Sequence, residues 1–181
     1  HSFHRRSTDG DDLTNDWVFA LASGEAGPVA ATRLTAAFTK VSQALALRIV
    51  SDGEGFERAI RVRVCGAGSS EAALQVARTI AQSLLVRTAV TGGDPNWGRI
   101  LAAAGRAGVP FSPDEVRLEV GGVPLYCDGA PAPTPLAERE RAFRETIVEI
   151  LLDLGRGGPT EEFLSCGLTE AYVRLNSDYT T

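Results

Sequence analysis

Apolar residues in the first third of the chain predict a strand followed by a long helix. Trp17 to Leu21 is a short apolar run that ends at Ser23-Gly24, which is typical of a buried strand. After Pro28, which suits the first turn of a helix, one apolar helical face is formed by Leu34, Phe38, Val41, Leu45 and Ile49. The turn-forming run Ser51-Asp52-Gly53-Glu54-Gly55 is expected to end this helix.

A second strand and a second helix follow. Ile60, Val62 and Val64 alternate with arginines, and this period of two is typical of a half-buried strand. Ser69 is a suitable cap for a helix whose apolar face is Leu74, Ala77, Ala81 and Leu84. The order strand, helix, strand, helix indicates the α/β class.

The second half of the chain continues the mixed pattern. The expected elements are a turn-rich segment over 91–99, a short helix over 100–105, a β-hairpin over 116–125 around Gly121-Gly122, a strand over 146–154 with 162–166 pairing to it, and a polar helix over 169–175. We expect a boundary near Arg87 to Gly93, which divides the chain into parts 1–90 and 91–181.

Composition and charge exclude several classes of protein. The chain has 181 residues and 44% are hydrophobic, which is enough for a core. The formal net charge is −5 and no basic run occurs, which argues against a nucleic-acid surface. No segment approaches the ~18 consecutive apolar residues of a membrane helix. Because the sequence contains no Met, we expect that it is a processed product or fragment and that a segment precedes His1.

Histidine and cysteine usage limits the possible chemistry. Both histidines lie within the first four residues, so a Ser-His-Asp or Cys-His site is not expected. Cys65, Cys127 and Cys166 lie far apart, which argues against a zinc site and fits a reducing cytoplasm. An enzyme built from this chain would take its base from a carboxylate, a lysine or an amine supplied from elsewhere.

Two glycine-containing segments are better explained as structural loops. Cys65-Gly66-Ala67-Gly68 lies between a strand and a helix, as phosphate loops do, but Glu71 stands at the third glycine position and would repel a pyrophosphate. The acidic run Asp9-Gly10-Asp11-Asp12 lacks the remaining ligands of an EF-hand loop. We therefore expect a plain turn at the first and a solvated loop at the second.

Three other segments keep a structural and a functional interpretation open. The acidic turn 52–55 is either a helix stop with exposed acids or a holder for an ammonium group. In the segment 94–99, Asp94 and Asn96 can bond backbone amides and Arg99 can meet a carboxylate. The polar tail 176–181 is a frayed end unless it docks back onto the fold.

Taken in order, these segments resemble a known family. They are Asp9-Gly10-Asp11 with Thr14-Asn15-Asp16, Asp52-Gly53-Glu54-Gly55, Asp94-Pro95-Asn96-Trp97-Gly98-Arg99-Ile100, and Leu168-Thr169-Glu170-Ala171-Tyr172-Val173-Arg174-Leu175-Asn176 with the closing Asp178-Tyr179-Thr180-Thr181. Together they are similar to the β chain of the ornithine acetyltransferase (glutamate N-acetyltransferase, ArgJ) family of arginine biosynthesis. The resemblance spans essentially the whole chain.

The resemblance implies a fold, a reaction and partners. The family fold is an αββα sandwich shared between α and β chains, here residues 1–90, with a C-terminal α/β lobe, here 91–181, and the assembly is α₂β₂. The precursor cleaves itself before a Thr, which carries the acetyl group from N-acetylornithine to glutamate with its own α-amine as base. An oxyanion hole comes from the α chain. No cofactor or metal is implied, although acetyl-CoA is a possible donor.

The resemblance also assigns individual residues. Glu54, Asn176 and Thr181 match substrate-contacting positions, so the tail would be docked. The nucleophilic Thr is expected upstream of His1, and Thr32 is not its counterpart because it falls inside the predicted helix. The chain departs from the family pattern at Glu57-Arg58, Trp17 and Gly167. The alternatives are a self-processing aminopeptidase of related fold and a non-catalytic amino-acid-binding fragment.

Overall fold

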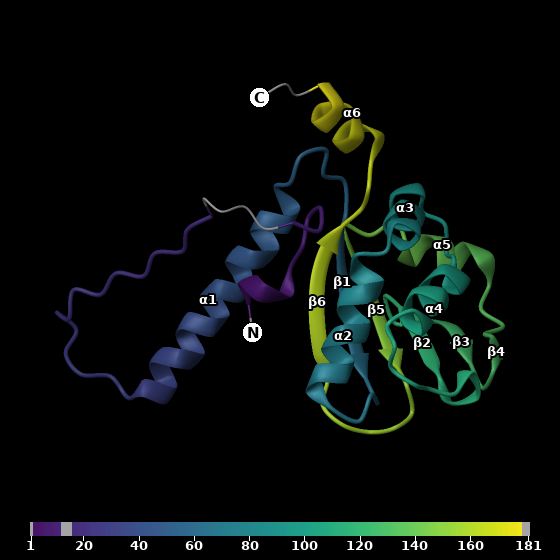
Figure 1. The fold of residues 1–181 in the computed structure, drawn as a ribbon, viewed down its shortest axis with the longest axis horizontal. Coiled ribbons are helices and arrows are strands. Elements are labelled where there is room, and N and C mark those ends of the chain that lie inside the picture. Colours follow the sequence, from purple (N-terminus) through teal and green to yellow (C-terminus); the bar gives the residue numbers. More distant parts are fainter. Residues whose placement is uncertain (1, 12–15, 179–181) are drawn as a thin grey trace.

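A mixed six-stranded sheet forms the centre of the molecule (Figure 1). The computed structural model describes residues 2–11 and 16–178. The strands are β1 (Ala59–Cys65), β2 (Arg117–Val120), β3 (Val123–Cys127), β4 (Ala130–Pro131), β5 (Ile147–Asp153) and β6 (Glu161–Cys166), in the spatial order β4-β3-β2-β5-β1-β6. The neighbours β1 and β5 are parallel, and the other neighbouring pairs are antiparallel. The predicted α/β class is confirmed.

Helices α2 (Ser70–Ala81) and α4 (Trp97–Gly105) cover one face of this sheet, and the C-terminal end of α1 (Ala31–Ser51) packs on the other. The other helices are α3 (Leu84–Gly92), α5 (Leu136–Ala142) and α6 (Glu170–Asp178), with short 3₁₀ turns at Phe3–Arg5 and Pro113–Glu115. Helix α2 lies over β1 and β6, and α4 packs beside it (Figure 1). The core between them contains Val62, Ile80 and Ile150, all fully buried. None of the helices in the described part of the chain is long and apolar enough to span a membrane.

The opposite face of the sheet carries charged side chains beside the small apolar cluster on which the end of α1 packs. The Arg61 Nη1 atom lies 2.6 Å from Glu149 Oε1, and Arg63 Nη2 lies 3.2 Å from Glu149 Oε2. These side chains are partly exposed, so each pair contributes little to stability. The alternation predicted at 60–64 and 146–154 is confirmed, because fully buried residues alternate with half-buried ones along β1 from Ile60 and along β5.

Several predicted elements are confirmed, and others need correction. The hairpin β2–β3 and helices α2 and α4 form where expected, and the Ser69 Oγ atom accepts from the Ala72 amide at 3.2 Å. Strand β6 pairs with β1 and not with β5, because β5 already has β1 and β2 on its two edges. The predicted second helix ends at Ala81, so Leu84 begins α3 instead of extending its apolar face.

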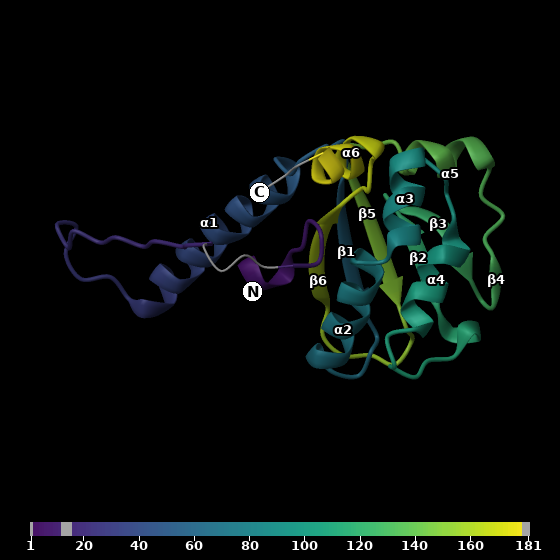
Figure 2. The same cartoon turned by 45° about the horizontal axis from the view of Figure 1, so that its top comes forward.

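The strands of the single sheet come from both parts of the chain. Strand β1 from residues 1–90 lies between β5 and β6 from residues 91–181. Helix α3 continues across residues 90 and 91. Figure 2 shows α1 and the segment before it projecting from the sheet that begins at β1.

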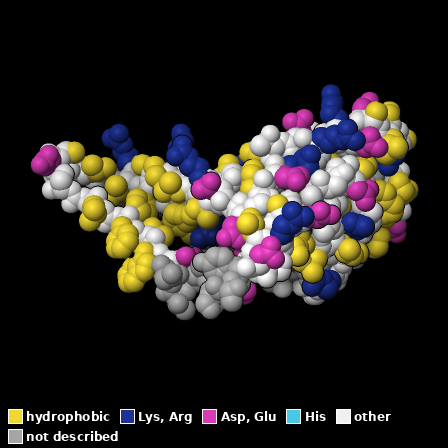
Figure 3. All heavy atoms as spheres, turned by 90° about the horizontal axis from the view of Figure 1, so that it is seen from above, with side chains coloured by type: hydrophobic (Ala, Val, Ile, Leu, Met, Phe, Trp, Pro, Cys, Tyr) yellow, Lys and Arg dark blue, Asp and Glu magenta, His cyan; other side chains and the backbone are white. Residues whose placement is uncertain are grey.

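The projecting part exposes apolar side chains that the sequence predicted to be buried. Trp17 to Leu21 forms no strand, and its Leu21 side chain is 97% exposed, because no described strand lies beside it to pair with. Helix α1 forms as predicted but begins at Ala31, so Pro28 lies before its first turn. Its predicted apolar face, including Phe38, is 40–60% exposed, whereas Ala46 and Val50 pack against β6. Figure 3 shows hydrophobic side chains along this projection.

Candidate functional site

The acidic turn joins α1 to the strand β1. Helix α1 ends at Ser51 and is capped by Asp52, whose amide donates to the Ile49 carbonyl at 3.3 Å. Gly55 then adopts φ +66°, a left-handed conformation that favours glycine. The Phe56 amide donates to the Gly53 carbonyl at 3.0 Å and closes the turn. The turn therefore presents the Glu54 carboxylate to solvent.

Helix α6 brings the second predicted contact residue to this turn. The Asn176 Nδ2 atom donates to Glu54 Oε2 at 2.9 Å and to the Tyr172 carbonyl at 3.0 Å. The two residues are 122 positions apart in sequence. The structure thus brings Glu54 and Asn176 together, and the tail is docked as far as the end of α6. The third predicted contact, Thr181, lies outside the described residues.

Thr169 fastens α6 to the acidic turn. Its side chain is 3% exposed, and its Oγ1 atom donates to the Gly55 carbonyl at 2.8 Å. The same Oγ1 accepts from the Tyr172 amide at 3.1 Å, as the capping residue at the start of a helix does. A Cβ atom added at Gly55 would lie 2.5 Å from the Tyr172 amide nitrogen. The backbones of the turn and the helix are therefore in direct contact.

The buried guanidinium of Arg87 supports the base of this site. Its Nε donates to the Cys166 carbonyl at 2.8 Å, and its Nη2 donates to the Thr8 carbonyl. Burial raises the pKa of the Cys166 thiol, and the nearby Arg87 charge only partly opposes this. The Cys166 side chain therefore stays a neutral thiol at pH 7 and supplies no nucleophile.

Carboxylates make the surroundings of α6 electronegative. Partial burial raises the pKa of the Tyr172 phenol, the Asp9 carboxylate raises it further, the Arg87 charge opposes this, and the Glu54 carboxylate adds a smaller rise. The Asp9 Oδ1 atom accepts from the Asp11 amide at 3.1 Å, which orders part of the loop expected to be merely solvated. Two carboxylates and one guanidinium thus act on the same phenol.

Sequence reasoning missed three residues of this site: Asp9, Arg87 and Thr169. A threonine directly before Glu170 is a signal for a helix cap, so Thr169 was open to prediction as one. Its second hydrogen bond, to Gly55, depends on tertiary structure and has no sequence signal. Arg87 lies within α3, and no local pattern distinguishes it from a surface arginine.

The departures from the family pattern have different structural settings. Arg58 Nη1 donates to the Thr91 carbonyl at 2.8 Å, near the C-terminal end of α3. At Gly167 an added Cβ would lie 2.5 Å from Thr91 Oγ1, so Thr91 fills the space of a larger residue. Trp17 is 74% exposed and stacks on Phe19. Arg58 and Gly167 thus both help to hold α3 against its neighbours.

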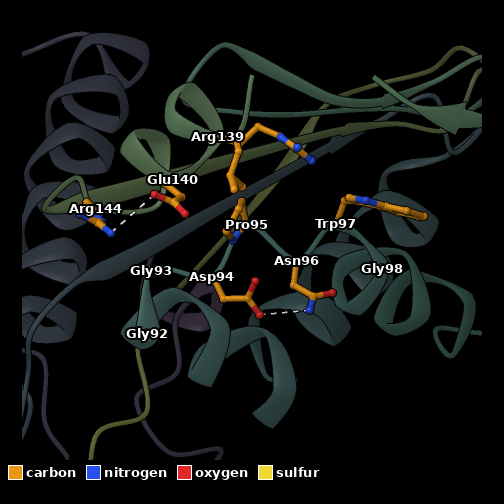
Figure 4. A pocket seen from close by; sticks show the side chains of 11 residues that line it. Gly92, Gly93, Asp94, Pro95, Asn96, Trp97, Gly98, Arg139, Glu140 and Arg144 are labelled. Carbon is orange, nitrogen blue, oxygen red and sulfur yellow. Dashed lines mark hydrogen bonds and ion pairs between the residues drawn. The ribbon is translucent and has the colours of Figure 1, made fainter. Parts of the chain in front are cut away.

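The segment 94–99 forms a helix cap beside an open hollow of about 600 Å³ (Figure 4). Asn96 Oδ1 accepts from the Arg99 amide at 3.1 Å, and Asn96 Nδ2 donates to Asp94 at 3.1 Å. Arg99 Nη1 donates to the Leu85 carbonyl at 3.1 Å, so it meets a backbone carbonyl and not the carboxylate considered from sequence. Trp97 packs on Tyr126. These contacts favour the structural interpretation.

The remaining sequence candidates also have structural settings. Gly66 has φ +68° and lies against Asp153, which adds a second acid to a loop already disfavoured by Glu71 as a phosphate site. Thr32 lies in the first turn of α1. Within residues 2–11 and 16–178, no three His, Cys, Asp or Glu side chains converge as metal ligands do.

Comparisons with known proteins show the family of this chain. The profile of the ArgJ family matches residues 1–181. The chain is 44% identical over 180 residues to the arginine biosynthesis bifunctional protein ArgJ of Thermus thermophilus, which covers 99% of this chain and 47% of that protein. The protein of the same name from Parasynechococcus marenigrum is 45% identical, with 99% and 44% covered. The chain therefore spans about half the length of these relatives.

A solved structure shows the same fold. The crystal structure of arginine biosynthesis bifunctional protein ArgJ from Bacillus halodurans superposes with a TM-score of 0.93 at 33% identity. The match covers 98% of this chain and 87% of that one. The whole length of the chain is thus accounted for by one family, both in sequence and in fold. The chain belongs to the ArgJ family.

Proposed function

We propose that this chain is the substrate-holding part of an acetyltransferase that moves an acetyl group from N-acetylornithine to glutamate in arginine biosynthesis. The observation that carries the proposal is the Glu54–Asn176 hydrogen bond, which joins two predicted contact residues on an exposed, electronegative surface. Family membership supports it, because the relatives are named for arginine biosynthesis.

In this proposal Glu54 and Asn176 hold the substrate. N-acetylornithine carries a side-chain ammonium, and the Glu54 carboxylate forms a charge-assisted hydrogen bond with it. Asn176 donates to one oxygen of Glu54 and so fixes the direction in which the carboxylate faces. Thr181 is proposed as a third contact on the resemblance alone.

The nucleophile is proposed to be a Thr in the segment that precedes His1 in the full protein. Its hydroxyl attacks the acetyl carbonyl, its α-amine takes the proton, and the amide C–N bond breaks to release ornithine. The amine of glutamate then attacks the acetyl-threonine ester, which regenerates the hydroxyl. An oxyanion hole from the α chain stabilises both tetrahedral intermediates. This sequence of steps needs no imidazole, metal or cofactor.

The partner of this chain is proposed to be the α chain of the same precursor, in an α₂β₂ assembly located in the cytoplasm. The apolar face of α1 and the run Trp17 to Leu21 are exposed in this chain. Exposed apolar surfaces of this kind are typical of an interface with another chain. In the family's αββα sandwich, this run would pair with further strands. The chain spans about half the length of its relatives, which leaves material for such a partner.

Incubating the full-length protein with N-acetylornithine and glutamate tests the proposal. Acetylglutamate and ornithine should form in equal amounts, and without glutamate the protein should accumulate one acetyl group per active site. Release of acetate that does not depend on glutamate would indicate the aminopeptidase-like alternative. Binding without turnover would indicate a non-catalytic module. A parallel reaction with acetyl-CoA and glutamate tests acetyl-CoA as a second donor.

A further inference from the structure

The hydroxyl of Thr169 connects the two elements that carry the proposed substrate contacts. It donates to the carbonyl of Gly55, the neighbour of Glu54, at 2.8 Å. It accepts from the amide of Tyr172, in the first turn of the helix that carries Asn176, at 3.1 Å. A hydroxyl has one hydrogen and two lone pairs, so it can make both bonds at once. One atom thus joins the acidic turn to α6.

The backbones of the acidic turn and of α6 are in direct contact. A Cβ at Gly55 would lie 2.5 Å from the Tyr172 amide nitrogen and 3.0 Å from the carbonyl carbon of Ala171. No side chain separates the two backbones here, so a shift of α6 moves Asn176 directly relative to Glu54.

The segment that leads to Thr169 is itself fixed to the fold. The Gly167 amide donates to the Arg58 carbonyl at 3.0 Å, and the Leu168 amide donates to the Arg87 carbonyl at 3.4 Å. A Cβ at Gly167 would meet Thr91 Oγ1 at 2.5 Å, so this stretch packs closely on α3. The segment before Thr169 is therefore held by the sheet and by α3, and Thr169 is the residue through which it contacts the acidic turn.

We propose that Thr169 is a positioning residue whose hydroxyl sets the distance between Glu54 and Asn176 and thereby the affinity of the site for its amino-acid substrate. This inference rests on the proposed function for its substrate. Thr169 is buried and acts through the turn and the helix, not by touching the substrate. Without the hydroxyl, the Gly55 carbonyl and the Tyr172 amide lose a shared partner, and α6 separates from the turn.

The kinetic test compares three variants of the full-length, self-processed protein. Thr169→Val removes the hydroxyl and keeps the shape, and Thr169→Ser keeps the hydroxyl. Thr79→Val is the matched control, because its Oγ1 donates only to Gln75 in the exposed part of α2, at 2.8 Å. Thr169→Val should raise the KM for N-acetylornithine about tenfold with a smaller change in kcat, as expected for a lost hydrogen bond that orients a contact. Thr169→Ser and Thr79→Val should stay within about twofold of wild type.

Hydrogen exchange gives a readout that does not depend on the reaction. In Thr169→Val the amides of α6 should exchange about tenfold faster than in wild type, while those of β1 are unchanged. If Thr169→Val does not fold, Gly55→Ala displaces α6 from the same contact and should produce the same rise in KM and the same faster exchange. Gly53→Ala is its control, because a Cβ there meets nothing closer than 3.4 Å.

The outcomes separate the two proposals. If the wild-type protein transfers no acetyl group, the proposed function fails, and exchange at α6 alone decides the docking role of Thr169. If wild type is active and Thr169→Val keeps the wild-type KM and the wild-type protection of α6, the positioning role is wrong. Where Thr169→Val does not fold, the same result for Gly55→Ala has the same meaning. Equal damage from Thr169→Ser and Thr169→Val would also overturn it, because the hydroxyl would then not be the cause.

Discussion

Arg87 is a buried residue on which two distant backbone segments depend. Its guanidinium is only 4% exposed and supplies donors to the Cys166 and Thr8 carbonyls. The planar guanidinium donates in two directions and so reaches both carbonyls, whereas the single ammonium group of a lysine does not. The N-terminal segment and the strand before α6 are therefore held by the same side chain.

Removing this guanidinium should destabilise the fold. We expect Arg87→Met to lower the free energy of unfolding by about 2–3 kcal/mol, because two buried carbonyls lose charged donors. Arg99→Met, which removes a partly exposed donor to the Leu85 carbonyl, should cost less than about 1 kcal/mol. Urea denaturation measures both. Equal losses in the two variants would show that burial of Arg87 does not decide its contribution.

Cys65 is half-buried, and its surroundings disfavour the thiolate. Burial raises the pKa of the Cys65 thiol, and the Asp153 carboxylate raises it further. A raised pKa keeps the sulfur protonated as the pH passes through the usual range of a thiol, so alkylation at pH 8 should be slower than for a free cysteine.

The effect of the neighbouring charge on Cys65 is testable by substitution. Asp153→Asn removes the charge and keeps the Oδ1 that accepts from Gly155, so alkylation of Cys65 by iodoacetamide at pH 8 should become about two- to threefold faster. Peptide mass mapping follows Cys65 separately from Cys127. An unchanged rate would mean that access, and not charge, limits the reaction.

At the residue scale, the sequence named candidate contact residues and not the residues that hold them in place. Glu54 and Asn176 came from the resemblance to the family, and the structure brings them within hydrogen-bond distance. Thr169 and Arg87 act through tertiary contacts with partners far along the chain. A spacing rule describes one element at a time, so it does not reveal such partners.

At the element scale, local periodicity predicted which segments are helices and strands, but not what each face contacts. The 3.6-residue period correctly indicated α1, yet Ala46 and Val50 pack on this chain while the larger apolar residues stay exposed. The apolar composition of Trp17 to Leu21 likewise indicates burial but does not identify the surface that buries it. Apolar side chains lower their free energy by burial against any chain, so the pattern alone does not distinguish an internal core from an interface.

The exposed face of α1 should be required for assembly. Phe38→Glu places a charge on this face, and we expect it to abolish co-purification of the tagged β chain with the remainder of the self-cleaved protein. Lys40→Glu puts the same residue at an exposed polar position two residues further along α1 and should leave association unchanged. Size-exclusion chromatography with mass analysis reports the outcome. Assembly of Phe38→Glu like wild type would show that this face is not the interface.

At the scale of the whole molecule, one sheet supports a site at its margin. The strands β1 and β6 and the helix α3 fix the segments that carry the acidic turn and α6. The projecting α1 connects this same turn to the exposed apolar surface (Figure 2). Binding of a partner at α1 would therefore place it next to Glu54, which suits a site completed by a second chain.

The most direct test of this account is the KM for N-acetylornithine in the full-length protein carrying Glu54→Gln. Gln keeps an oxygen that accepts from Asn176 and removes the charge, so the KM should rise about 10- to 100-fold, as for a lost charge-assisted bond. Glu57→Gln, an exposed acid close to the turn, should leave the KM unchanged. A KM for Glu54→Gln equal to that of wild type would contradict the assignment of Glu54 as the residue that holds the substrate.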